Sequence, residues 1–435
     1  MAAFAILAVV LLLYARGFRL DFTNRHLVKT GSLVIETQPT RARVSLNGKP
    51  QSERTNTVFE YLVPGTYIVR LEKEGYLPRE YTVEITPRVS SFLTDVNLFP
   101  QPEHVTETLL AQNVDGIARD PWQRYLVATR VENGSTELFT IATSWFSNAT
   151  ELVPLATIPS ETVEVRAWDS TNPRLLLSFR QEDQNVFWAI DLSTRAIEDF
   201  SSVALQQSFR AIVFGRESNT YAAITTDGEL LYISKETREV QTLDSGPWID
   251  LTITNDHVWL LDDLRHVWVS AFPVTPGSLQ DIATVGDTTQ HRFSVLSDLV
   301  VLETSEQVSL FMLSDGRIQE LSISDLSYPS TFMLQDPSHL VGVYSTRVVA
   351  IDTEQGTTRV ITRSSTNISD AVFHNNGTSV FLATHDGLEA KDWERTAPYN
   401  TQIPIARVFQ QLATSRNARF LFGLTDDGNL YRYTW

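Results

Sequence analysis

The chain has 435 residues, of which 42% are hydrophobic, and it contains no cysteine. Disulfides, thiolate zinc sites and thiol nucleophiles are therefore excluded, whereas the hydrophobic content is enough for a large core. The charge is uneven: residues 1–100 hold 12 Lys and Arg against 9 Asp and Glu, a balance of +3, and the remainder carries −20. A part that acidic repels phosphate backbones, so we expect no nucleic-acid partner.

The N-terminal segment, residues 1–14, is almost purely apolar and is followed at once by Arg16 and Arg19. Such a run belongs in lipid, but it is shorter than the roughly 20 residues that a full span needs. A start site assigned inside a longer helix, or a helix completed by residues 15–18, would account for the difference. We therefore expect residues 1–20 to form a membrane anchor, with a cleaved signal peptide and a buried helix as alternatives.

Residues 21–30 are polar and predict a short linker between the anchor and the rest of the chain. Four basic residues cluster here and just before: Arg16, Arg19, Arg25 and Lys29. Under the positive-inside rule this cluster favours a topology with the C-terminal part inside the cell.

The stretch 31–100 predicts one small β-sandwich. Residues 32–36 and 43–46 alternate apolar and polar side chains, the period of a strand with one buried face. Asn47-Gly48 supplies the two positive φ angles that a tight hairpin needs. Pro64-Gly65 marks a second turn, after which residues 67–71 and 81–85 show the same alternation.

The order and spacing of residues in this stretch resembles the PEGA domain, a β-sandwich of bacterial and archaeal surface proteins. The residues that carry the resemblance are Pro39, Ala42, Val44, Asn47, Gly48, Leu62, Pro64, Gly65, Tyr67, Lys73, Gly75, Tyr76 and Pro78. One departure is Arg41, which stands where the family's tetrapeptide has glycine. The resemblance implies an envelope location, a role in binding or spacing, and no enzymatic activity.

Residues 13–18, just before the sandwich, look like the membrane exit of PEGA proteins from candidate-phylum bacteria. On this resemblance alone we place the C-terminal part on the outer side of the cell membrane, as the extracytoplasmic ectodomain of a single-pass protein. The basic cluster opposes this orientation.

Residues 101–435 contain a recurring unit of four short strands. The turns between the second and third strand of each unit begin at Asn133, Asp183, Asp227, Asp262, Ser305, Ser345, Asp386 and Asp427. They recur roughly every 40 residues, as the four-stranded blades of a β-propeller do. We therefore predict an all-β chain with a propeller of eight blades, or of seven if one unit is an insertion.

The last unit ends at Trp435, directly after its third strand, so its fourth strand must come from elsewhere. Residues 104–110 form a spare strand, in which Val105 and Leu109 alternate with threonines. We expect this strand to dock beside the terminal strand, close the ring and protect its open edge.

Aromatic residues give the candidate ligand-binding positions. Trp248 and Tyr328 lie where one blade passes to the next, on the face that also carries the turns between second and third strands. Flat rings there can stack on sugars or hold a peptide, with packing beneath the loop as the alternative. The tryptophans inside strands predict packing between blades: Trp188, Trp259, Trp268, Trp393 and Trp435.

The remaining polar motifs point to no metal, cofactor or catalytic residue. The Asp-Gly pairs at 227, 315, 386 and 427 lack the alternating carboxylates of a calcium loop and predict hairpin turns. His257 and His266 lie on neighbouring strands of one hairpin, where a metal-binding pair is the alternative to exposed strand ends. No serine shows a nucleophile-elbow pattern.

We therefore expect a membrane-anchored protein of the cell envelope whose propeller binds an envelope protein or polysaccharide. Two alternatives remain. One is a scaffold in envelope protein assembly, and the other is a glycan-acting hydrolase or lyase. A deep central pocket of converging carboxylates with raised pKa values would favour the enzyme, and a plugged central channel would exclude it.

Overall fold

The structure is a computed structural model of the chain. It describes residues 17–434 except for segments 22–25, 144–150, 183, 201–207, 218, 238, 255, 276, 287–290, 297–298, 305–307, 315–316, 324–330, 337–338, 353–356, 375–378, 393–400, 404, 406 and 416–419. Apart from the 3-10 turn η1 (Pro102–His104), every regular element within these residues is a strand. The prediction of an all-β chain is confirmed for this part.

The first described residues form a hairpin of β1 (Phe18–Asp21) and β2 (His26–Lys29), paired from Phe18↔Lys29 to Asp21↔His26. This corrects two expectations, because residues 18–20 were assigned to the anchor helix and residues 21–30 to a linker. The Arg19 guanidinium lies over the Tyr61 ring, 4.5 Å from its centre, and this contact holds the hairpin against the sandwich.

The rest of the expected anchor, residues 1–16, lies outside the described residues. Within the part of the chain that is described, no helix is long and apolar enough to cross a membrane.

Residues 31–97 form the predicted sandwich. One sheet has the order β6-β3-β9 and the other β5-β4-β7-β8. The strands are β3 (Gly31–Gln38), β4 (Arg43–Leu46), β5 (Lys49–Arg54), β6 (Thr57–Leu62), β7 (Gly65–Glu72), β8 (Arg79–Ile85) and β9 (Ser90–Asn97). Alternate residues of both sheets meet in one core, including the fully buried Leu33, Ile35 and Val69.

Two turns of the sandwich depend on left-handed backbone. Asn47 and Gly48 have φ angles of 48° and 76°, as a hairpin turn with two positive φ angles requires. Arg41, at the position where the family has glycine, has a φ of 65°, a left-handed conformation that glycine adopts more readily than arginine.

Residues 106–434 form eight four-stranded sheets within the described chain, which we number in chain order. The first sheet consists of β11 (Gly116–Arg119), β12 (Tyr125–Glu132), β13 (Ser135–Ala142) and β14 (Val153–Ile158), and the second of β15 (Val163–Trp168), β16 (Arg174–Gln181), β17 (Gln184–Asp191) and β18 (Ile197–Asp199). The third consists of β19 (Phe209–Phe214), β20 (Thr220–Thr225), β21 (Glu229–Ser234) and β22 (Glu239–Ser245), and the fourth of β23 (Trp248–Ile253), β24 (His257–Asp262), β25 (His266–Ala271) and β26 (Gln280–Thr284).

The fifth to eighth sheets follow the same order. The fifth sheet consists of β27 (His291–Leu296), β28 (Leu299–Thr304), β29 (Val308–Ser314) and β30 (Arg317–Ile323), and the sixth of β31 (Thr331–Asp336), β32 (His339–Tyr344), β33 (Arg347–Asp352) and β34 (Thr357–Arg363). The seventh consists of β35 (Ile368–Phe373), β36 (Ser379–Thr384), β37 (Gly387–Asp392) and β38 (Thr401–Gln402). The eighth consists of β39 (Phe409–Thr414), β40 (Phe420–Thr425) and β41 (Leu430–Thr434), with β10 (Thr106–Ala111) as its fourth strand.

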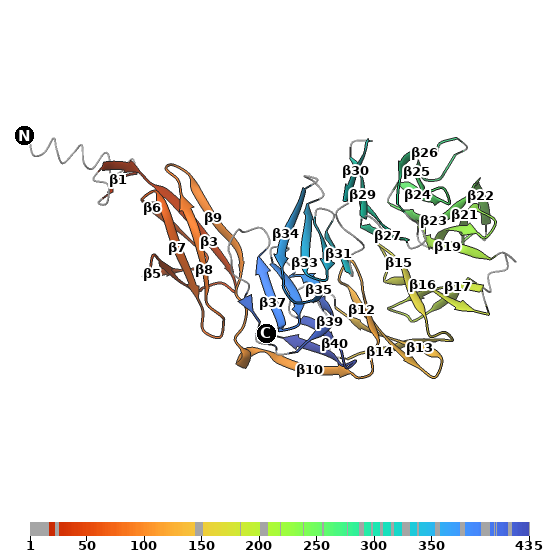
Figure 1. Cartoon of the computed structure of the whole chain (residues 1–435), viewed down its shortest axis with the longest axis horizontal. Helices are drawn as coiled ribbons and strands as arrows, with labels where there is room; N and C mark the ends of the chain where they lie inside the picture. The colour runs from red at the N-terminus through yellow and green to blue at the C-terminus, as the bar shows by residue number, and fades with distance from the viewer. Residues whose placement is uncertain are drawn as a thin grey trace, which may run out of the picture.

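The strand β10 closes the eighth sheet, as predicted. It runs antiparallel to β41, from Thr106↔Thr434 to Leu109↔Tyr431, and lies beside the C-terminal strand in Figure 1. The strand order β10-β41-β40-β39 places it at the outer edge. A segment from the start of the propeller thus completes its last sheet and covers the edge of β41.

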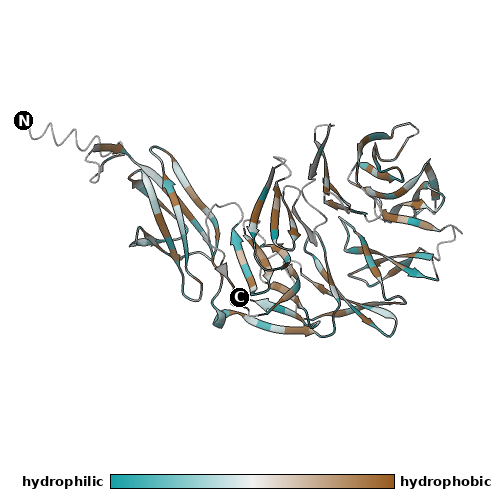
Figure 2. Cartoon of the chain, in the orientation of Figure 1, coloured by the Kyte–Doolittle hydropathy of each residue, from teal (hydrophilic) through white to brown (hydrophobic). Residues whose placement is uncertain are grey.

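Apolar packing joins the sheets into a ring. Figure 2 shows hydrophobic residues, in brown, along the propeller strands, and the second strands β20, β36 and β40 are buried throughout. Apart from the sandwich core, each apolar cluster joins two successive sheets. One more joins the last sheet to the first, where Phe422 and Leu430 meet Leu126 and Ala128. The described residues therefore form a closed β-propeller.

Candidate functional site

A buried polar cluster joins the sandwich to the seventh sheet. Arg79 donates from Nη2 to Asp392 Oδ2 (3.0 Å), and the Tyr81 hydroxyl donates to the same oxygen (2.8 Å). Ser379 Oγ donates to Asp392 Oδ1 (2.8 Å) and accepts from Asn97 Nδ2 (3.0 Å). Both charged side chains are less than 10% exposed. We call these five residues the clamp.

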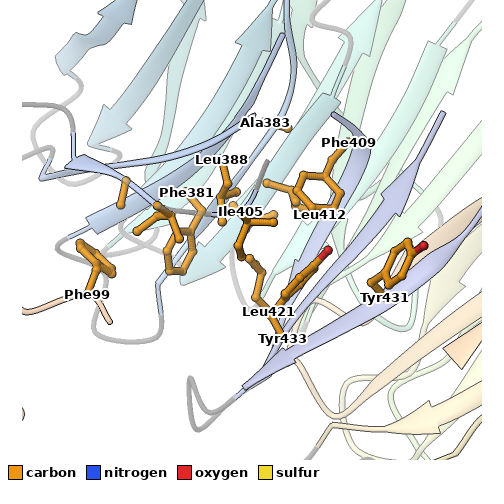
Figure 3. Close-up of a cluster of buried hydrophobic side chains, with 13 residues drawn as sticks. Phe99, Phe381, Ala383, Leu388, Ile405, Phe409, Leu412, Leu421, Tyr431 and Tyr433 are labelled. Atoms are coloured by element: carbon orange, nitrogen blue, oxygen red, sulfur yellow. The ribbon is translucent and has the colours of Figure 1, made fainter. Parts of the chain in front are cut away.

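The chain between the two domains is packed as well. Phe99 belongs to the apolar cluster between the seventh and eighth sheets, and its ring meets that of Phe381 edge-on with centres 5.6 Å apart (Figure 3). The Leu77 amide donates to the Phe99 carbonyl (2.7 Å). The sandwich is thus fixed to the propeller at a buried interface, with its hairpin β1–β2 at the far end (Figure 1).

First strands of neighbouring sheets lie against one another around most of the ring, for example β35 against β39 and β19 against β23. Asp250 on β23 is 2% exposed and accepts from Arg166 Nη2 on β15 (2.8 Å), across the intervening third sheet. His291 Nε2 lies 3.2 Å from its other oxygen. Burial alone would raise the pKa of Asp250, but the hydrogen bond with His291 and the charge of Arg166 hold it below its usual value.

A second pair of the same kind lies further round the ring. Asp370 on β35 is fully buried and accepts from Arg119 Nη1 on β11 (2.9 Å), across the eighth sheet. It also accepts from the Leu412 amide (2.7 Å). Trp122, in the turn after β11, packs against apolar residues of the fifth and sixth sheets, on the other side of the ring. Side chains therefore span the axis.

Neither of these two axial carboxylates has the environment of a general acid. A general acid needs a raised pKa, whereas Asp250 has a lowered one and is held by two partners. Asp370 is held by Arg119 and a backbone amide. These carboxylates act as structural ion pairs that fix the first strands to one another.

One buried carboxyl is different. Glu303, near the end of β28, is 3% exposed, and its Oε1 has no hydrogen-bond partner among the described residues. The same holds for the buried Tyr344 hydroxyl, at the end of the neighbouring strand β32. Burial raises the pKa of Glu303, and the charge of Arg292 opposes this only in part.

We expect Glu303→Gln to stabilise the protein at neutral pH by on the order of 1 kcal/mol, because the amide avoids burying a charge. Since the pKa of Glu303 is raised in the folded state, its stabilising contribution is present at low pH and is lost as pH rises through the folded pKa. The stabilisation of the protein by Glu303→Gln should therefore vanish near pH 4, where the carboxyl of the original protein is uncharged when folded. Thermal unfolding between pH 4 and 8 checks this, with Glu236→Gln on an exposed turn as the control. Equal melting of both variants would contradict it.

A polar groove of about 540 Å³ lies between the first and second sheets. Its walls come from the ends of β12 and β16, the starts of β13 and β17, and the connection 159–162. All of these lie at the end of the strands that carries the turns between second and third strands. The groove is thus on the face that the sequence indicated for ligand binding.

The groove presents free donors and acceptors on the side formed by the second sheet and the connection that leads into it. Glu161 and Thr162 come from the connection between the sheets, and Arg180 and Asn185 from the β16–β17 hairpin. All four are exposed, and their side chains make no hydrogen bond within the described residues. Phe179 lines the groove but is 4% exposed, so no open ring face is available for stacking on a sugar.

The two aromatic candidates lie elsewhere. Trp248 is 5% exposed, donates from Nε1 to Asp244 (3.2 Å) and meets Trp268 edge-on with ring centres 6.0 Å apart. Its ring packs beneath the loop and offers no open face to a ligand. Tyr328 lies outside the described residues, so its role stays a prediction.

The histidine pair is not brought together. His257 begins β24 and pairs with Ala271, whereas His266 begins β25 at the other end of the hairpin. His266 Nδ1 instead lies 2.6 Å from Asp281, and this hydrogen bond raises its pKa. Among the described residues no cluster of three or more His, Asp or Glu could hold a metal ion.

Fold and site together define a β-sandwich joined to a β-propeller through a buried interface. Residues 30–97 match the family model of the PEGA domain, so the sandwich is a PEGA domain. A comparison with curated proteins gave no match.

Two solved propellers are similar to this chain. The C-terminal WD40 domain of Sif2 has a TM-score of 0.48 at 10% identity, and BamB from Moraxella catarrhalis has a TM-score of 0.42 at 12% identity. Each comparison covers 76% of this chain and 98% of the other.

Proposed function

We propose that this protein is a membrane-anchored recognition protein of the cell envelope. In this proposal the eight sheets are the eight blades of the propeller, and the groove between the first two blades binds a segment of an envelope protein. The PEGA domain holds that groove in a fixed orientation to the N-terminal end of the chain.

The observation that carries the proposal is the set of free side chains in the groove. The carboxylate of Glu161 and the hydroxyl of Thr162, from the connection 159–162, lie beside the guanidinium of Arg180 and the amide of Asn185, from the β16–β17 hairpin. Such a mixture suits a polypeptide, whose backbone and side chains offer both donors and acceptors. A sugar-binding site would more often present an open aromatic ring, so polysaccharide becomes an outcome of the test.

The full-length protein in detergent should co-sediment with its organism's envelope fraction and lose this binding when the fraction is stripped of protein. Reversing both charges, with Glu161→Lys and Arg180→Glu, should weaken binding at least about tenfold, because each reversed side chain would then repel the charged group of the ligand that it binds. The net charge stays unchanged. Arg195→Glu with Glu236→Lys, both exposed outside the groove, is the matched control.

The outcomes are distinct. Binding that survives protein stripping would identify a polysaccharide ligand and overturn the protein-partner assignment. Equal loss in the control variant would mean that the groove has no special role. Absence of binding to either fraction would contradict envelope recognition itself.

A further inference from the structure

The N-terminal part of the chain enters the propeller through the strand that closes it. After the PEGA domain, the chain passes Phe99 and the turn η1 and then forms β10, the outermost strand of the eighth sheet. Thr106, the first residue of β10, is at the end of the ladder with β41. A pull from the N-terminal side would therefore peel β10 one residue at a time, starting from Thr106.

At its N-terminal end, opposite Thr434, β10 is held by little besides that ladder, because the packing of Leu110 and Ala111 against the first and eighth sheets lies at its other end. Glu107 accepts from Arg407 Nη2 (2.6 Å) and Nε (3.0 Å), but both side chains are more than a third exposed. Exposed ion pairs contribute little in water. The strand that closes the ring is thus weakly attached at the point where the tether enters.

The clamp provides a second path for the same load. Asn97, the last residue of β9, donates to Ser379, and Arg79 and Tyr81 on β8 bind Asp392. Ser379 and Asp392 face each other at the open end of the β36–β37 hairpin, within the ring itself. Force on the PEGA domain can therefore pass directly into the seventh sheet, before the chain reaches Thr106.

From this geometry we infer that the clamp is a mechanical lock, which keeps tension on the N-terminal end of the chain from opening the propeller. Loss of β10 would expose the edge of β41 and part of the packing between the last and first sheets. The lock is independent of what the groove binds. It requires only that the chain be pulled from its N-terminal side.

Single-molecule force measurements on the full-length protein test this inference. Because the sequence has no cysteine, Val89→Cys on the PEGA domain and Leu264→Cys on the propeller provide two unique handles, both exposed. At constant force, Asp392→Ala should shorten the time to release of β10 at least about 100-fold, the factor expected when a buried ion pair loses one partner. Glu72→Ala, which removes an exposed ion pair inside the PEGA domain, should have no effect.

Order of rupture separates a lock from simple destabilisation. With the clamp intact, Arg407→Ala should leave the first rupture unchanged, because β10 is not yet loaded. In the Asp392→Ala background it should accelerate release. The inference would be overturned if Arg407→Ala accelerated the first rupture while the clamp is intact. It would also be overturned if the Asp392→Ala variant and the original protein released β10 after equal times. If Asp392→Ala fails to fold, Tyr81→Phe removes one hydrogen bond and should shorten the lifetime about fivefold.

Discussion

Replacing Asp250 by alanine is expected to lower the free energy of unfolding by about 3 kcal/mol, because it leaves Arg166 and His291 without their shared partner inside the ring. We place the value at the lower end of the range for broken buried pairs, since Arg166 keeps a second contact with Glu164 at 3.3 Å. Urea unfolding followed by tryptophan fluorescence measures the change.

The pH dependence gives this prediction a sign. Because the pKa of Asp250 is lowered in the folded state, its contribution is present above the unfolded pKa and is lost as pH falls through the folded one. The difference between the original protein and Asp250→Ala should therefore be constant near neutral pH and shrink below about pH 4. A difference that grows in acid would contradict the assignment of Asp250 as an ionised partner.

A matched control is available on the propeller surface. Asp256 forms an ion pair with Arg216 in which both side chains are more than half exposed. Asp256→Ala should change stability by less than about 1 kcal/mol, because water screens such a pair. If Asp250→Ala and Asp256→Ala lowered the free energy of unfolding equally, the buried axial pair would contribute no more to stability than an exposed one.

Much of the propeller could be predicted from local sequence. Turn residues such as Asn133-Gly134 fix where one strand ends and the next begins, and the described strands follow these positions. The closing strand was also predictable, because the last unit lacked one strand and the alternating segment before the first unit had no other partner. These features depend on residues close together in the chain or on strand count.

The clamp and the axial side chains could not be predicted in this way. Arg79 and Asp392 are 313 positions apart, and nothing in either neighbourhood marks the other. In the sequence, nothing distinguishes Trp122 from other tryptophans in turns, and only the closed ring brings it into contact with the fifth and sixth sheets. The hairpin β1–β2 was missed for another reason: its strands adjoin an apolar run that indicated a helix.

The candidate site was predicted only as a face. Sequence placed ligand binding at the end of the strands where blades connect, and the groove is there. The residues of the groove differ from the predicted ones, because Trp248 is of a residue type that often binds ligands but is buried like a core residue. Glu161 and Arg180 carry no motif. They lie near each other because β15 pairs with β16, with Val163 opposite Phe179.

The largest effect is expected at the clamp. Arg79→Ala or Asp392→Ala should each lower the free energy of unfolding by about 3–5 kcal/mol, because either leaves a buried charge unpaired. The PEGA domain should then unfold in a separate transition, since only the packing of Phe99 and Leu77 and the Asn97–Ser379 hydrogen bond would be left of the described contacts between it and the propeller. Calorimetry of the full-length chain measures both effects.

The apolar pair distinguishes a charge effect from lost packing. Arg79→Met combined with Asp392→Leu removes both charges while keeping side-chain volume, so it should recover most of the loss. Recovery should stop short by about 1–3 kcal/mol, because Tyr81 and Ser379 would lose their shared acceptor. If the paired variant were as unstable as the sum of the single ones, packing around the clamp and not its ion pair would hold the two domains together.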